Sequence, residues 1–266
     1  MIWSRIEIDY LIENYNIIPP IKIAQQLNRS YAAIIQKANS IGLKTEYNYH
    51  TPKYNESFLD IWTPELAYFT GVVLADGCVS PPDGSLGYYV RISMCDLDII
   101  EKLKKNADSQ GNIRKDKNGN NIKDRFTIDF RGKKICDFFI DLGIGYNKTH
   151  TVKFPNMIPI RYMSHFIRGI FDGDGSICIN INKHGYPRAK ICGTKNVIES
   201  ISHYARIPNN IYKKHQDGTT YDIQYSGDKA IEFLNYIYKD SNINIRMNRK
   251  YNKYLESFKW QQWRKQ

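Results

Sequence analysis

One nine-residue pattern occurs twice in this chain, 98 residues apart, and it constrains the fold more than any other feature. Residues 69–77 read FTGVVLADG and residues 167–175 read IRGIFDGDG. Each is an apolar run with small residues four positions apart, which is typical of a helix whose backbone packs closely on a partner. Each run ends in Asp-Gly, so each predicted helix delivers one carboxylate, Asp76 or Asp174, at its C-terminal end.

The position of these two acids is electrostatically unfavourable. A helix C-terminus carries partial negative charge, so an Asp there does not stabilise the helix. Two such ends brought together would form a carboxylate pair that repels itself unless a cation lies between them. Mg²⁺, or Mn²⁺ in its place, prefers a few carboxylates completed by water and phosphate oxygens. The repeated segment therefore predicts a divalent metal site formed by Asp76 and Asp174.

From Thr63 onward the order of predicted elements also repeats. Asp76 and Asp174 are 98 residues apart, and the hairpin glycines Gly119 and Gly218 are 99 apart. The first half is predicted to contain a helix that begins at Thr63-Pro64, a strand at 88–94, a helix at 96–107, a strand through 125–131 and a helix at 133–142. The second half is predicted to contain the second signature helix, a strand at 188–192, a helix at 196–206, a strand at 221–226 and a helix at 228–239. Turns are expected at 82–84, 118–119, 184–185 and 217–218.

Each half therefore reads α-β-β-α-β-β-α, and the two halves form a pseudo-twofold object within one chain. Residues alternate along the strands: Val90, Ile92 and Met94 are predicted to face the core, and so are Phe126, Ile128 and Phe130. Arg125, Thr127, Asp129 and Arg131 are predicted to face outward. The expected fold class is α+β, with tandem αββαββα halves built on antiparallel sheets.

The first fifty residues follow a different pattern. Three short helices are predicted, at 6–15, from Pro20 to 27, and from a Ser30 N-cap to 41, where Gly42 ends the last one. A tight turn before the third helix makes a helix-turn-helix pattern, and the groove-facing residues are Arg29, Tyr31, Ala33, Gln36 and Lys37. A helical cap without a DNA role is the alternative. The predicted domains are a helix-turn-helix domain at 1–45, a first repeated half at 63–155 and a second repeated half at 156–266. Residues 46–62 are predicted to be a linker.

Composition narrows the class of partner. The formal net charge of +11 suits a polyanion. The five cysteines are scattered, which indicates neither a zinc site nor a disulfide framework. The N-terminus lacks an apolar signal core, and no stretch approaches the length of a membrane span. We therefore expect a soluble, cytoplasmic (intracellular) protein with access to DNA and no membrane association.

The two segments FTGVVLADG and IRGIFDGDG resemble the paired LAGLIDADG motifs of single-chain homing endonucleases, and the resemblance covers roughly residues 63–266. It implies antiparallel sheets that form a saddle over DNA and signature helices packed at the interface. The last acidic residue of each motif, Asp76 or Asp174, would bind the metal. The sequence departs from the motif at one position, where the first copy has Leu74 and the second has Asp172. This asymmetry would make the two strand cuts unequal.

The resemblance also implies basic residues around the cleavage centre. The segment LGIGYNKT at 142–149 is similar to the family segment that carries a catalytic lysine, here Lys148, with Arg249 as its predicted counterpart in the second half. The predicted DNA contacts are Arg29, Tyr31, Gln36, Lys37, Tyr89, Arg91, Arg125, Arg131, Lys153, Arg188, Lys190, Gln224 and Lys250.

The function that these features predict is site-specific double-strand DNA cleavage with Mg²⁺ or Mn²⁺. The chain would act as a monomer on a long, largely asymmetric target. A catalytically inactive DNA-binding transcription regulator and an RNA maturase on the same fold stay open as alternatives. An intein is not indicated, since the splice-junction Cys or Ser and the terminal His-Asn are missing.

Overall fold

The computed structural model describes residues 3–18, 20–44, 54–81, 87–116, 124–180, 185–214 and 218–264. The chain divides into two compact units, Met1–Thr51 and Pro52–Gln266. The predicted turns at 82–84 and 118–119 lie outside the described residues, and those at 184–185 and 217–218 lie partly outside them.

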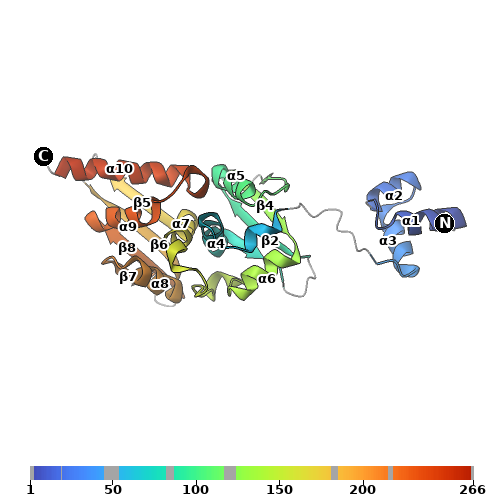
Figure 1. Ribbon diagram of the computed structural model, residues 1–266, viewed down its shortest axis with the longest axis horizontal. Helices are drawn as coiled ribbons and strands as arrows, with labels where there is room; N and C mark the ends of the chain where they lie inside the picture. The colour runs from blue at the N-terminus through green and yellow to red at the C-terminus, as the bar shows by residue number, and fades with distance from the viewer. Residues whose placement is uncertain are drawn as a thin grey trace. The chain divides into compact units, whose positions relative to one another are not determined.

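The smaller unit consists of α1 (Arg5–Asn14), α2 (Pro20–Gln26) and α3 (Tyr31–Ser40), shown in blue in Figure 1. Ser4 and Glu7 form a capping box at the start of α1, and the Ser30 hydroxyl accepts a hydrogen bond from the Ala33 amide at the start of α3. These helices pack around a small core of Leu11, Tyr15, Ile23, Ala24, Ile34 and Ala38. Gly42, at φ +77°, ends the last helix in the left-handed conformation that favours glycine.

The larger unit repeats one order of elements twice. The first half contains α4 (Pro64–Asp76), β1 (Gly77–Val79), β2 (Tyr89–Met94), α5 (Leu97–Asn106), β3 (Arg114–Asp116), β4 (Arg125–Arg131) and α6 (Lys133–Asp141). The second half contains α7 (Met163–Asp174), β5 (Gly175–Asn180), β6 (Gly185–Thr194), α8 (Lys195–Ala205), β7 (Asn210–Lys213), β8 (Thr220–Ser226) and α9 (Asp228–Tyr238). The long helix α10 (Asn248–Arg264) follows, and it was not among the elements predicted from the sequence.

Each half builds a four-stranded antiparallel sheet. The strand orders are β1-β2-β4-β3 and β5-β6-β8-β7, so the two sheets have the same topology. Val90, Ile92 and Met94 are buried on the face of β2 that packs on the helices. The predicted α+β class with two αββαββα halves is confirmed.

Helices α4 and α7 lie side by side between the two halves (Figure 1), and their backbones are in direct contact. A Cβ atom on Gly71 would overlap the carbonyl oxygen of Phe166, and one on Gly169 would overlap the carbonyl oxygen of Tyr68. Only glycine permits such a close approach. The close packing predicted from the small residues is therefore confirmed.

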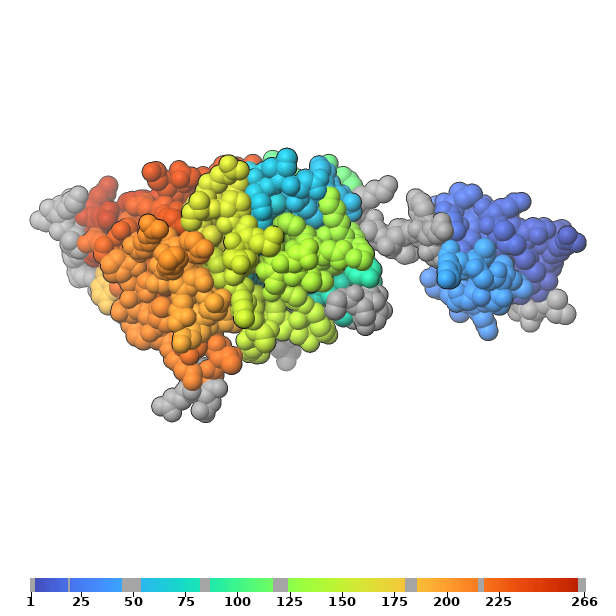
Figure 2. Space-filling model, turned by 60° about the horizontal axis from the view of Figure 1, so that its bottom comes forward, coloured from blue at the N-terminus to red at the C-terminus, as the bar shows by residue number. Residues whose placement is uncertain are grey.

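The two halves share one continuous hydrophobic core, which includes the buried faces of α4 and α7. In Figure 2 the surface of the first half, coloured cyan to green, adjoins that of the second, coloured yellow to red. Helix α10 joins this core through an aromatic seam, in which the rings of Tyr238 and Tyr254 stack with centroids 5.4 Å apart. The first turn of α10 lies beside the end of α7, where Lys250 Nζ donates a hydrogen bond to the Phe171 carbonyl oxygen.

Candidate active site

The two signature carboxylates lie where α4 and α7 end. The chain enters β1 directly after Asp76 and β5 directly after Asp174, so each acid stands at a helix-to-strand junction. Gly173 makes room for the first of them, since a Cβ at that position would lie 2.7 Å from Asp76 Oδ2. The predicted placement of both acids at C-terminal helix ends is confirmed, and the packing of the two helices brings them into one region.

Neither carboxylate is in a favourable environment for its charge. Desolvation raises the pKa of Asp76, and the lysines Lys250 and Lys148 oppose that rise. Desolvation and then the negative charge of Asp76 raise the pKa of Asp174 to about 6. The two carboxylates therefore repel one another, as the sequence indicated, and a bound cation would relieve that repulsion.

Two lysines complete the site in a pseudo-symmetric way. Lys148, in the short 3₁₀ helix η2 (Lys148–His150), donates from Nζ to the carbonyl oxygen of Leu74 at 2.7 Å. Lys250, in the first turn of α10, donates from Nζ to the carbonyl oxygen of Asp172, also at 2.7 Å. Leu74 and Asp172 occupy the same position in the two motifs. Burial lowers the pKa of Lys148, and it lowers the pKa of Lys250 to about 8.

The structure corrects the predicted partner of Lys148. Arg249 was expected to be its counterpart, but its guanidinium extends to Asp96, with Nε and Nη2 both 2.9 Å from the carboxylate oxygens. Lys250, which we predicted only as a DNA contact, is buried at the end of α7. By the equivalent bonds to Leu74 and Asp172, the position that matches Lys148 is Lys250, one residue beyond the one chosen from the sequence.

Asp172, the acid that only the second motif copy has, lies in an environment unlike that of Asp76 and Asp174. It is fully buried and accepts hydrogen bonds from the hydroxyls of Tyr68 and Tyr238, at 2.8 and 2.6 Å, and from the Met247 amide at 2.8 Å. Burial raises its pKa, while these donors stabilise the carboxylate. The extra acid of the second copy thus joins α4, α7 and α9. It is bonded to these donors within the core, and Asp174 is the acid of α7 that is exposed.

Each of the two signature acids, Asp76 and Asp174, lines a separate surface hollow. One, of about 590 Å³, is lined by Asp76 together with Ser93, Asp96, Arg125, Gly173, Met247 and Arg249 among others. The other, of about 250 Å³, is lined by Asp174 with Leu74, Lys148, His150, Cys192 and Lys214 among others. The two carboxylates therefore face solvent through differently shaped and differently charged openings.

On the outward face of the first sheet, two of the predicted arginines, Arg91 and Arg131, form ion pairs. Asp129 was expected to point into solvent, but it is only 2% exposed because Arg91, Arg114 and Arg131 cover it. Arg91 also stacks over the Tyr89 ring, with its Cζ 4.9 Å from the centroid. Thr127, likewise predicted to be outward, is buried and bonds Asp116. Arg125 is exposed, and its Nε donates to the Ser93 hydroxyl at 2.8 Å.

On the equivalent face of the second sheet, the described residues include the predicted contacts Lys190, Gln224 and Arg188. Lys190 pairs with Asp222 at 2.6 Å, and the Gln224 amide donates to the Ser226 hydroxyl. Arg188 is exposed. Lys153 lies outside both sheets, exposed at the rim of a shallow hollow that His150 and Lys213 also line.

In the smaller unit, a groove of about 490 Å³ runs along α3 and is lined by Trp3, Arg29, Ala33, Gln36, Lys37 and others. Gln36 and Tyr31 are exposed, and Lys37 is half-buried. Arg29 is engaged within its own unit, because its Nε lies 2.7 Å from Glu7 Oε1 and its guanidinium covers the Trp3 ring. That pairing fixes α1 to the turn before α3.

Arg114 and the buried role of Asp129 were not predicted from the sequence. Arg114 belongs to the three-residue strand β3, which is too short to show alternation. The pairing of Arg91 with Asp129 could have been found from the sheet register, in which these residues lie opposite each other on β2 and β4.

The donor set fits a hard divalent cation. Among the described residues, no group of three or more His, Cys, Asp or Glu side chains is placed to hold a metal ion. What the site offers is a carboxylate pair with raised pKa values, and Mg²⁺ and Mn²⁺ accept such sparse sets when water and phosphate oxygens fill the remaining positions. In the described parts of the chain, no helix has the length and apolar character needed to cross a membrane.

Some known proteins are similar to this chain in sequence or in fold. No protein-family model matches the chain. DNA-directed RNA polymerase subunit Rpo1C of Methanocaldococcus jannaschii is 29% identical over 114 residues, which are 42% of this chain and 13% of that protein. A probable translation initiation factor IF-2 of the same organism is 27% identical over 209 residues, 70% of this chain and 16% of that protein. The chain thus spans less than a fifth of either relative.

Among solved structures, the homing endonuclease I-WcaI bound to its DNA recognition sequence superposes with a TM-score of 0.53. The match covers 78% of this chain and 94% of that one, at 13% sequence identity. The match supports the α+β architecture with two four-stranded antiparallel sheets. The chain has the fold of the LAGLIDADG homing endonucleases.

Proposed function

We propose that this protein is a site-specific double-strand DNA endonuclease, and that Asp76 and Asp174 hold the divalent metal at its cleavage centre. One observation carries the proposal. The tight packing of α4 on α7 brings two partly desolvated carboxylates together, and each faces its own hollow beside a buried lysine. Such an arrangement serves no evident purpose in stability, since like charges at helix C-termini oppose folding.

The chain's own residues would position the scissile phosphates and balance charge. Asp76 and Asp174 would bind Mg²⁺ or Mn²⁺, which supplies an activated water and neutralises the phosphate. Lys148 and Lys250 are held by the carbonyl oxygens of Leu74 and Asp172, so their ammonium groups remain beside the carboxylates without a bound ligand. Each lysine would stabilise the negative charge that develops on its own scissile phosphate.

DNA binding would extend well beyond this centre. The outward faces of the two sheets carry Tyr89, Arg91, Arg125, Arg131, Arg188, Lys190 and Gln224, and we infer that they contact the two arms of one duplex. The groove of the smaller unit, with Gln36 and Lys37, would add contacts on one flank as a helix-turn-helix domain. Because both halves belong to one chain, a monomer would suffice, and its target need not be symmetric.

The test is a cleavage selection. The full chain is incubated with a library of duplexes of random sequence, with Mg²⁺ or with EDTA, and the cut ends are sequenced. We expect one long site to be cut on both strands only with Mg²⁺. If duplexes are retained on the protein and none is cut, the protein is a DNA-binding regulator. If RNA alone is retained, a maturase role replaces the proposal.

Lys250 and Arg249 give a direct test of the pseudo-symmetric assignment. We expect Lys250→Met to lower the rate of cleavage about a hundredfold or more on one strand, because one buried positive charge at the phosphate is lost. Arg249→Met should keep most of the activity, since its guanidinium is bonded to Asp96. Strand-resolved cleavage of the selected site measures both. Equal losses in the two variants would contradict the assignment.

The carboxylate pair also predicts how pH affects metal use. Because the pKa of Asp174 is raised to about 6, this acid is protonated in the free protein at lower pH and must release a proton to bind metal. The Mg²⁺ concentration for half-maximal cleavage should therefore rise about tenfold for each pH unit below 6 and change little above pH 7. Cleavage at varied Mg²⁺ and pH measures this, with DNA affinity in EDTA as the control. A midpoint that stays constant from pH 5 to pH 7 would contradict the prediction.

A further inference from the structure

The centre of the first sheet's outward face is a single buried carboxylate shared by three arginines. Asp129 Oδ1 lies 2.7 Å from Arg91 Nε and 3.1 Å from Arg114 Nη2, while Oδ2 lies 3.1 Å from Arg131 Nη2. Burial alone would raise the pKa of Asp129, but the hydrogen bonds from Arg91 and Arg114 outweigh it and lower the pKa to about 2. The carboxylate is therefore charged at every pH at which the protein would act.

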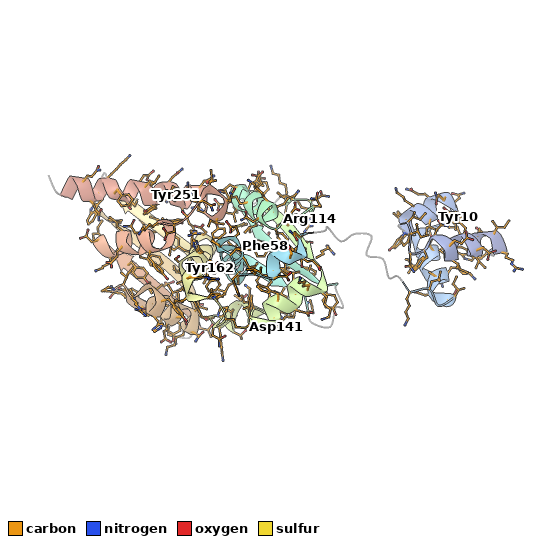
Figure 3. The ribbon with its side chains drawn as sticks, in the orientation of Figure 1. Tyr10, Phe58, Arg114, Asp141, Tyr162 and Tyr251 are labelled. Atoms are coloured by element: carbon orange, nitrogen blue, oxygen red, sulfur yellow. The ribbon has the colours of Figure 1, made fainter. Side chains whose placement is uncertain are left out.

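These arginines remain open to a ligand on their other side. Their side chains are 41%, 45% and 35% exposed for Arg91, Arg114 and Arg131, although the acid beneath them is 2% exposed. Tyr89 supports two of them, since the Cζ atoms of Arg91 and Arg131 lie 4.9 and 5.9 Å from its ring centroid. The three guanidinium groups line a hollow of about 480 Å³ with Ser93, Arg125 and Thr127. In Figure 3 Arg114 lies towards the outer end of the first sheet, away from α4 and α7.

The arrangement differs from what phosphate binding alone requires. Attraction to phosphates needs only net positive charge, and the buried acid subtracts from that charge. What the acid adds is order, because it fixes three flexible side chains in defined positions before any ligand arrives. When one edge of a guanidinium is bonded to an acid, the N–H groups on its other edge remain available in a fixed fork geometry. This geometry matches the O6 and N7 acceptors of guanine in the major groove.

We propose that Asp129 is a positioning residue that turns Arg91, Arg114 and Arg131 into one guanine-reading unit, so that the DNA arm under the first sheet carries a block of guanines. This inference rests on the proposed DNA-binding function. The second sheet lacks such a unit among its described residues, since Asp222 pairs there with the single cation Lys190 at 2.6 Å. The other arm of the target should therefore show no equivalent block.

The test compares base preference among variants of the full chain. Duplexes are selected from a random-sequence library in Ca²⁺, which permits binding without relying on cleavage. Asp129→Asn removes the shared charge with little change of shape. Asp124→Asn is the matched control, because it makes the same charge change in an exposed pair with Lys115 on the same sheet. Asp222→Asn is the control for the second sheet. Arg114→Lys retains the positive charge but loses the forked N–H geometry of the guanidinium.

We expect the unaltered chain to select a guanine block in one arm, and Asp129→Asn to lower that preference by roughly 5- to 150-fold per guanine, the range of one good bidentate contact. Its affinity for random DNA should be unchanged or higher, since a negative charge is removed. Asp124→Asn and Asp222→Asn should keep the guanine block. Circular dichroism shows whether Asp129→Asn folds. If it does not, Arg114→Lys is the test, and we expect this variant to lose the guanine preference at fewer positions of the target site.

Two results would overturn the inference and leave the proposed function standing. One is a selected and cleavable site without a guanine block, which would place the arginines on phosphates. The other is a guanine block that the folded Asp129→Asn and Arg114→Lys variants both retain. If the unaltered chain selects no DNA, the proposed function itself fails, and the inference fails with it.

Discussion

Asp76→Asn and Asp174→Asn should each abolish double-strand cleavage while DNA binding remains within about threefold of the unaltered chain. Each change removes one of the two carboxylates that we propose to bind the metal, and the loss of a hard anionic ligand should lower the cleavage rate at least about a thousandfold. Binding should persist because we propose that its contacts lie on the sheet faces, and a lost negative charge does not weaken attraction to phosphates. Cleavage of the selected duplex on each strand, and its affinity in Ca²⁺, measure the two effects separately.

The two variants are not expected to be identical, because the acids lie in different surroundings. Asp76 faces the larger hollow with Arg125 and Asp96, whereas Asp174 faces the smaller one with Lys148. Asp137→Asn is the control, since this half-buried acid pairs with Lys133 on α6, away from both hollows. Full activity in either Asp76→Asn or Asp174→Asn would refute the metal assignment, and unfolding of both would show that the acids are structural.

Gly169→Val should strongly destabilise the folded protein. A Cβ at this position already overlaps the Tyr68 carbonyl and approaches the Val72 amide nitrogen to 2.8 Å, so both helix backbones must separate. Overpacking a close interface costs about 3 kcal/mol or more, a large share of the stability of about 5–15 kcal/mol that is usual for a protein. Thermal unfolding should show a midpoint lower by roughly 6–12 °C for a chain of this size.

Gly145→Val is the matched control for that experiment. A Cβ on Gly145 meets nothing within 4 Å, and its backbone does not require a positive φ. We therefore expect a change in midpoint of no more than a few degrees. Similar midpoints for the two variants would mean that α4 and α7 do not pack through their glycines.

Much of this architecture follows from local sequence patterns. The ends of α4 and α7, the Thr63 and Ser30 caps and the alternation along β2 depend on near neighbours in the chain, so the sequence alone indicated them. Helix α10 has aromatic residues on its inner face, at Tyr251, Tyr254 and Phe258, yet its many polar residues concealed that pattern.

The arrangement of charges was harder to predict than the elements. Alternation places Asp129 on the outward face of β4, but it does not reveal that arginines from β2, β3 and β4 meet above it and exclude water. The assignment of Arg249 instead of Lys250 shows the same limit. One residue along an α-helix rotates a side chain by about 100°, so a small error in alignment exchanges a buried cation for an exposed one.

The bonding of Asp172 has a consequence for whether the two halves are interchangeable. Tyr68 of α4 donates one of its hydrogen bonds, and the corresponding residue of α7 is Phe166, which has no hydroxyl. If the second half paired with a copy of itself, each Asp172 would face a phenylalanine and lose that donor inside the core. The second half should therefore pack less stably on a copy of itself than on the first half, because its buried carboxylate would have one hydrogen-bond donor fewer.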